Sequence, residues 1–110
     1  MTFKASFWFG VVARGGRGLF CRDRISPFVP SPGMRVSFGD DPEKWEISRV
    51  SRVGRSRTWA CHLGDFEEPD RDWLEIRDAY LARGWVLLRE WVDCPWGWQS
   101  FWLWDCRGAG

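Results

Sequence analysis

FKASFWFGVVARGGRGLFCRD, residues 3–23, is the stretch that decides the fold. In its first half every second side chain is apolar, at Phe3, Ala5, Phe7, Phe9 and Val11. This period of two predicts a strand over residues 3–13. Residues 14–17 contain two glycines and predict a hairpin turn, because glycine adopts the positive φ that such turns need. Residues 18–23 are then the returning strand, so the chain is expected to open with a long antiparallel hairpin.

Five shorter segments further along the chain are also predicted to be strands. They are residues 34–38, 45–53, 57–63, 85–92 and 98–104. The second and third form a hairpin around Gly54, where Val50 interrupts the alternation and suggests a bulge. Three prolines make residues 26–33 an extended connection. The strand at 85–92 begins with apolar residues on both faces, which favours a central place in the sheet.

One helix is predicted, over residues 70–83. Apolar side chains recur there at helical spacing, at Trp73, Leu74, Ile76, Tyr80 and Leu81. Asp70 is the candidate N-cap, Pro69 suits the first turn and Gly84 is the expected left-handed stop. Strands segregated from one helix predict the α+β class, with a strongly bent, mainly antiparallel sheet of about seven strands, barrel-like in one version.

Length and composition are those of a small globular protein. The 110 residues fit one domain, expected over residues 1–106 with a flexible tail at 107–110. No secretory signal or membrane span is evident in the sequence, so we expect a cytoplasmic protein. The four cysteines are then expected as free thiols, although Cys21 and Cys61 could still meet across strands.

Tryptophan is the most unusual part of the composition, with ten indoles in 110 residues. A domain of this size has one modest core, which cannot enclose them all. The last strand is apolar on both faces and carries Trp98, Trp102 and Trp104, and Trp96 lies in the turn before it. One face can meet the core, but the other would be an exposed patch. We expect it to form the interface of a homo-oligomer, a dimer first of all, or to line an aromatic cleft for a small organic or cationic ligand. Burial within the monomer is the third interpretation.

A second candidate surface is a group of arginines around the Gly54 turn. Its members are Arg49, Arg52, Arg55 and Arg57. Arginine makes forked contacts to phosphate, and Trp45 and Trp59 on the flanking strands could add stacking, as in sites for single-stranded nucleic acid. The alternative is a solvated hairpin tip. Residues 1–62 carry 11 Lys and Arg against 5 Asp and Glu, whereas residues 63–110 carry 5 against 10, so the net charge of +1 is unevenly spread.

Evidence for catalysis is weak. His62 is the only histidine, and its neighbour Cys61 points to the opposite face of a strand. Cys21 and Asp65 are the other partners open to it. No closely spaced cysteines or histidines predict a metal site, and no motif predicts a cofactor. The leading hypothesis is therefore a small non-enzymatic binding protein that self-associates through its Trp-rich strand. The alternatives are a nucleic-acid-binding module that uses the arginines, and a small hydrolase or isomerase around His62.

Overall fold

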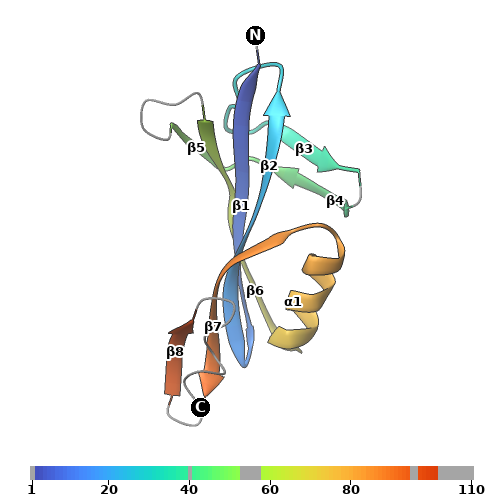
Figure 1. Ribbon diagram of the computed structural model, residues 1–110. Helices are drawn as coiled ribbons and strands as arrows, with labels where there is room; N and C mark the ends of the chain where they lie inside the picture. The colour runs from blue at the N-terminus through green and yellow to red at the C-terminus, as the bar shows by residue number, and fades with distance from the viewer. Residues whose placement is uncertain (1, 40, 53–57, 95–96, 102–110) are drawn as a thin grey trace. The chain divides into compact units, whose positions relative to one another are not determined.

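A computed structural model gives the fold and describes residues 2–39, 41–52, 58–94 and 97–101 (Figure 1). Its elements are β1 (Phe3–Arg14), β2 (Gly16–Ser26), β3 (Arg35–Phe38), β4 (Asp41–Glu46), β5 (Arg49–Arg52), β6 (Thr58–Asp72), α1 (Trp73–Ala82), β7 (Val86–Cys94) and β8 (Gly97–Phe101). Six strands form one sheet in the order β5-β6-β1-β2-β7-β8, and β3 pairs with β4 in a second sheet. The α+β class is confirmed. Within the described residues the wide sheet has two edges, β5 and β8, so the barrel-like version was wrong.

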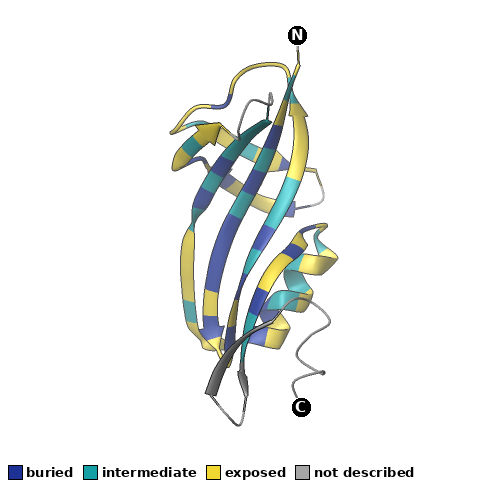
Figure 2. Ribbon diagram, turned by 60° about the vertical axis from the view of Figure 1, so that its left-hand side comes forward, coloured by how far each residue is buried: buried dark blue, intermediate teal, exposed yellow. Residues whose placement is uncertain are grey.

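The opening hairpin follows the predicted alternation. Every second residue of β1 from Ala5 to Ala13 is buried, whereas Lys4 and Val12 are exposed. Figure 2 shows this alternation as bands of buried and exposed residues along the strands. The turn is tighter than predicted, because Gly15 alone, with φ of +83°, separates the two strands. The returning strand is correspondingly longer.

The predicted strand over residues 45–53 is in fact two strands in different sheets. The amide of Ile47 still donates to the carbonyl of Met34, next to β3 (2.9 Å). The amide of the following residue, Ser48, donates instead to His62 of β6 (2.8 Å). The interrupted alternation near Val50 therefore marks a change of partner, and the bulge predicted there was wrong, since β5 pairs with β6 without a register shift.

The helix begins later than the sequence predicted. Asp72 is the N-cap, and its carboxylate accepts a hydrogen bond from the amide of Leu74 (3.2 Å). The expected cap Asp70 and the preceding Pro69 belong to β6 instead. Proline lacks the amide hydrogen that a strand needs on a paired side, so it is tolerated at an edge. Pro69 lies beyond the part of β6 that pairs with β5, which ends at His62.

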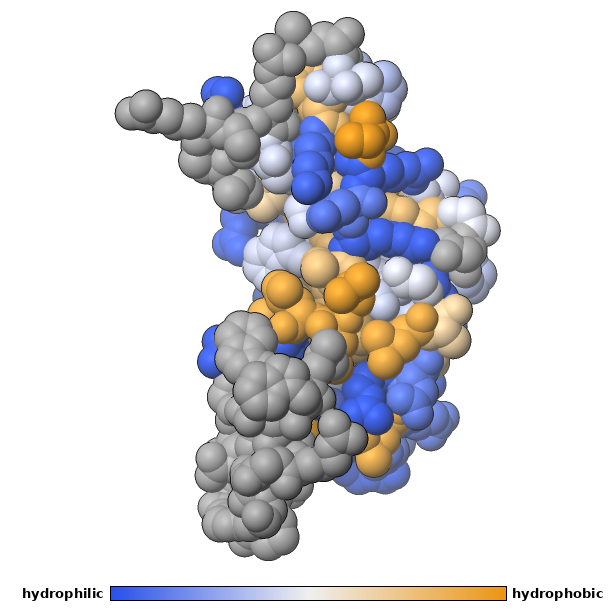
Figure 3. All heavy atoms as spheres, in the orientation of Figure 1, coloured by the Kyte–Doolittle hydropathy of each residue, from blue (hydrophilic) through white to orange (hydrophobic). Residues whose placement is uncertain are grey.

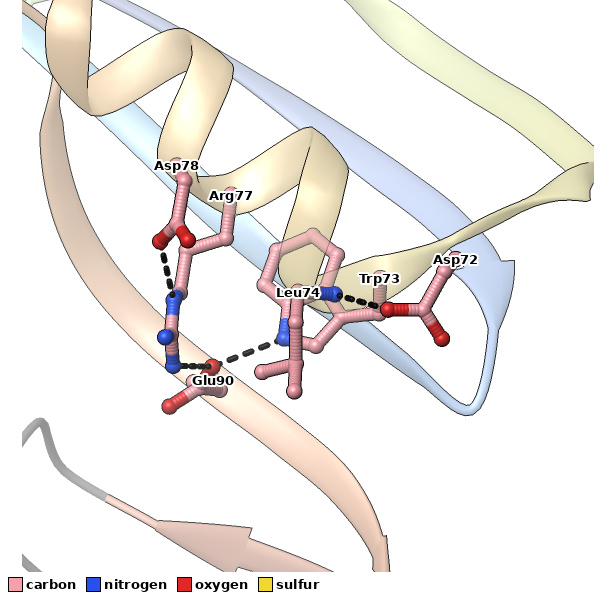
Figure 4. Close-up of polar contacts among 6 residues, drawn as sticks. All are labelled: Asp72, Trp73, Leu74, Arg77, Asp78 and Glu90. Carbon is pink, nitrogen blue, oxygen red and sulfur yellow. Dashed lines mark hydrogen bonds and ion pairs between the residues drawn. The ribbon is translucent and has the colours of Figure 1, made fainter.

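The helix is fastened to the sheet by its first residue, Trp73. A Cβ atom added to Gly18 of β2 would lie 2.5 Å from the Trp73 ring, so only glycine lets the indole approach this closely. The indole Nε1 donates to Oε2 of Glu90 on β7 (2.7 Å), and Nη1 of Arg77 donates to the same oxygen (3.1 Å; Figure 4). Of the predicted apolar stripe, Trp73 and Ile76 are buried.

The strand β7 has β2 and β8 as neighbours, which confirms its predicted place inside the sheet. Its apolar residues are not all buried, however. Leu87 is buried, as is Trp85 just before the strand, whereas Val86 and Leu88 are 57% and 48% exposed. Figure 3 shows apolar side chains gathered on the surface over the first half of β7 and over α1.

The chain forms two compact units. Unit 1 comprises Met1–Phe9 and Cys21–Gly64, and unit 2 comprises Gly10–Phe20 and Asp65–Gly110, so that β1, β2 and β6 contribute to both. Unit 1 carries nine Lys and Arg against five Asp and Glu, and unit 2 carries seven against ten. The uneven charge of the sequence is therefore also a property of the units. The expected extent of a single domain stays a prediction, and the tail at 107–110 lies outside the described residues.

Within the described part of the chain, no helix has the length and apolar character needed to cross a membrane.

Candidate functional site

The two surfaces predicted from the sequence are described only in part. Trp98 lies in β8 with its backbone opposite Asp93, and Arg49 and Arg52 lie on β5. The other members fall outside the described residues, namely Trp96, Trp102, Trp104, Arg55 and Arg57. The Trp-rich surface therefore stays a prediction, whereas β5 and the strands beside it are described.

The two described arginines do not share a surface. In the antiparallel pairing of β5 with β6, Arg49 is directly opposite His62 and Arg52 is directly opposite Trp59. Directly opposed residues lie on the same face of a sheet, and odd and even positions of a strand lie on different faces. The predicted group is therefore divided. Arg52 places its guanidinium 5.9 Å from the centroid of the Trp59 ring, whereas Arg49 belongs to the face that carries His62.

The imidazole of His62 is stacked on an indole from another strand. The ring centroids of His62 and Trp8 of β1 are 4.1 Å apart and their planes differ by 22°. Both side chains are partly buried. The backbone of His62 is held as well, because its carbonyl accepts hydrogen bonds from the amide and the hydroxyl of Ser48 (2.8 Å each). Sequence reasoning missed this pair, since nothing in the sequence gives the register between β1 and β6.

We call the surface formed by Lys4, Trp8, Arg49 and His62 the Trp8 face. Lys4 belongs to it because it lies an even number of residues from Trp8 along β1. Asp23 of β2 reaches the same side of the sheet, where it accepts a hydrogen bond from Ser6 (2.7 Å) and lies 3.8 Å from Lys4. Asp23 is therefore engaged by Lys4 and Ser6, which precede Trp8 on the same face of β1.

The opposite side of β1 holds the face in place. Phe7 and Phe9 flank Trp8 in sequence, and both are buried on the side that faces the small sheet. Phe9 is stacked on Trp45 of β4 with 4.6 Å between centroids, and Phe7 meets Phe38 of β3 edge-on at 5.4 Å. Because these anchors fix the backbone on both sides of Trp8, the indole is presented on a rigid strand.

The described cysteines argue against a thiol nucleophile beside His62. Cys21 and Cys61 are free thiols, and β1 lies between the strands that carry them, so the pairing left open by the sequence does not form. Burial raises the pKa of Cys61 from its ordinary value of 9.0 to about 11. Burial and then the charge of Asp23 raise the pKa of Cys21. Both thiols are therefore protonated at neutral pH, whereas a nucleophilic cysteine must be a thiolate.

No group of three or more His, Cys, Asp or Glu side chains suited to a metal ion occurs among the described residues. A scan against models of protein families finds no match to the chain. Searches of the curated proteins and of the solved structures also find no significant match. The candidate functional site of the described chain is therefore the Trp8 face.

Proposed function

We propose that this protein binds single-stranded nucleic acid on the Trp8 face. The observation that carries the proposal is the stacked pair of Trp8 and His62, with Arg49 directly across the strand pair from the imidazole. Proteins that bind single strands combine aromatic rings, on which bases stack, with cations that follow the phosphates. Here the partly buried Trp8 indole and the exposed Arg49 belong to the same face of the sheet, so both elements are present on one side of it.

The charge of unit 1 supports the same proposal. Its net charge is +4, counted from nine Lys and Arg and five Asp and Glu. A positive surface raises the local concentration of a polyanion and speeds its association. Unit 2 carries the opposite sign, which explains how a chain with a net charge of only +1 could hold a basic binding surface.

A single strand fits this surface better than a duplex. A sheet face with an aromatic ring reads unstacked bases, whereas duplex recognition uses elements that enter a groove. Stacking also tolerates any base, because every base has a π-face. We therefore expect binding with little sequence preference.

The test is fluorescence anisotropy with a labelled oligothymidylate and with the matching duplex at low salt. Trp8→Ala should weaken binding of the single strand by about 5- to 100-fold, because one base loses its stacking partner. Trp91→Ala is the matched control, since Trp91 is also partly buried and lies in unit 2, with the Arg17 guanidinium 4.8 Å from its ring. Absence of binding at low salt, or equal losses in the two variants, would overturn the proposal.

The electrostatic part is tested separately. Arg49→Gln should lower the affinity and reduce the salt dependence by about 0.7 in the slope of log K against log salt, as expected for one lost phosphate contact. Arg89→Gln in unit 2, whose guanidinium lies 4.7 Å from the Trp91 ring, is the matched control and should change neither quantity. An unchanged slope in Arg49→Gln would remove Arg49 from the site.

Self-association through the C-terminal hairpin is a second proposal, favoured by a different observation. In the described sheet β8 is an edge strand, opposite in the strand order to β5. An edge strand offers backbone groups with which a second copy can pair, and the sequence places Trp98, Trp102 and Trp104 in and after it. We expect light scattering to give the mass of a dimer for the wild type and of a monomer for Trp102→Glu, Trp104→Glu. A wild type that is monomeric at every concentration contradicts this proposal.

A further inference from the structure

An apolar groove lies in unit 1 between the end of β2, the proline-rich connection and β3. Its volume is about 470 Å³, which is within the usual range for small-molecule sites. The walls are mostly apolar and include Phe7, Ile25, Phe28, Pro30, Met34 and Val36. Phe7 and Trp8 lie on opposite faces of β1, so the groove does not overlap the Trp8 face.

The rim of the groove is apolar, and hydrogen bonds hold its backbone in place. Ile25 and Phe28 are 64% and 55% exposed. The Ser26 side chain accepts a hydrogen bond from the amide of Phe28 and donates one to its carbonyl (3.3 and 2.6 Å). At the other end of the connection, the amide of Gly33 donates to the carbonyl of Ile47 (2.7 Å). The connection is therefore tied down at both ends, and a preformed groove lowers the entropy lost on binding.

Among the described residues that line the groove, the charged side chains are two cations, Arg24 and Arg35. Arg24 is held in place, because its Nη1 donates to the carbonyl of Ser37 (2.5 Å) and its guanidinium lies 5.6 Å from the Phe38 ring centroid. Arg35 is exposed and stands opposite Glu46 in the pairing of β3 with β4. Glu46 is not among the residues that line the groove, so the described lining combines apolar walls with positive charge.

We propose that this groove binds a single-chain amphiphilic carboxylate. The alkyl chain lies along Phe7, Ile25 and Phe28, and the carboxylate accepts charge-assisted hydrogen bonds from Arg35, with Arg24 adding positive charge. Guanidinium and carboxylate pair through two parallel hydrogen bonds, which a cationic or neutral head group cannot form. Removal of the alkyl chain from water supplies the apolar part of the affinity. The proposal is independent of nucleic-acid binding, which uses the other face of β1.

The head group is tested first, by isothermal titration calorimetry with three probes that share one chain length. Decanoate, decyltrimethylammonium and decyl glucoside are each used below their micelle concentrations. Decanoate should bind one molecule per chain and at least about tenfold more tightly than the other two, because only it pairs with arginine. Equal affinities, or binding of many molecules without saturation, would show simple adsorption to apolar surface and overturn the proposal.

Two variants then assign the residues. Arg35→Gln should weaken decanoate binding by about tenfold or more, and because Arg35 is exposed the variant should fold, which circular dichroism verifies. Lys44→Gln is the matched control, since Lys44 lies on the neighbouring β4 and does not line the groove. Phe28→Ser should also lose decanoate binding and retain oligonucleotide binding. Wild-type affinity for decanoate in Arg35→Gln or in Phe28→Ser contradicts the proposed site.

Discussion

The indole Nε1 of Trp73 donates a 2.7 Å hydrogen bond to Oε2 of Glu90, and both side chains are buried. A carboxylate out of water is costly unless it is paired and hydrogen-bonded. Glu90 meets both conditions, because Arg77 of α1 donates to the same oxygen at 3.1 Å. Glu90 on β7 therefore satisfies the buried N–H of Trp73 and neutralises the charge of Arg77 on α1.

We expect Glu90→Leu to lower the free energy of unfolding by about 3 kcal/mol, since it leaves the Trp73 N–H unpaired and removes the counter-charge of Arg77. Urea unfolding measures this value. Asp78→Asn is the control, because Asp78 also pairs with Arg77, at 3.4 Å, but is 69% exposed. Exposed pairs contribute little, so its effect should stay below about 0.5 kcal/mol. Similar losses of unfolding free energy in both variants would mean that the burial of Glu90 does not strengthen its contacts.

Gly18→Ala should destabilise the protein, because the new Cβ atom would lie 2.5 Å from the ring of Trp73 and 3.0 Å from the carbonyl oxygen of Arg89. Overpacking of this kind costs about 1–3 kcal/mol. Gly39→Ala is the matched substitution, since a Cβ there meets nothing within 4 Å. Thermal unfolding of both variants distinguishes close approach from a general cost of replacing glycine. A neutral Gly18→Ala would mean that the indole can move aside.

Asp72→Ala should cost about 1 kcal/mol, because the carboxylate of Asp72 caps the amide of Leu74 at 3.2 Å. Asp70→Ala should have almost no effect, since Asp70 is an exposed residue of β6. Chemical denaturation of the two variants is the measurement. The reverse order of effects would place the helix start at Asp70, where the sequence alone had put it.

Stability should fall as the pH rises from about 9 to about 11, and Cys61 should account for part of the fall. The folded state raises the pKa of Cys61 from 9.0 to about 11, so in this window the unfolded chain has lost a proton that the folded chain keeps. Stability declines with pH wherever the folded state binds more protons, by about 2–3 kcal/mol for this shift. Cys61→Ala removes the thiol while other titrating groups remain. Its stability difference from wild type should therefore shrink by that amount between pH 8 and pH 11.

Local patterns in the sequence predict the parts of this fold that depend on neighbouring residues. The alternation of residues 3–13 correctly gives β1 and its buried face, because burial of one face imposes a period of two. The spacing of Trp73 and Ile76 correctly gives the buried side of α1. The helix start was misplaced because acidic residues and a proline are equally suited to an exposed edge of β6.

Contacts between segments far apart in the chain could not be predicted from local sequence patterns. The stack of Trp8 on His62 depends on the register of β1 against β6, and no turn links these two strands directly. Between Ile47 and Ser48 the chain passes from one sheet to the other. In the sequence this change appeared only as an interruption of the alternating apolar pattern. The place of Arg49 in a binding site stays a prediction, and its position opposite His62 is set by strand pairing and not by sequence proximity.

The three strands common to both compact units limit how this protein could be divided or inherited. No single cut of the chain separates unit 1 from unit 2, because β1, β2 and β6 each begin in one unit and end in the other. A gene fragment for either unit alone would encode strands that stop halfway. Neither the basic unit with its aromatic pair nor the acidic unit with its helix can therefore be produced from one continuous segment of the chain with all its strands complete.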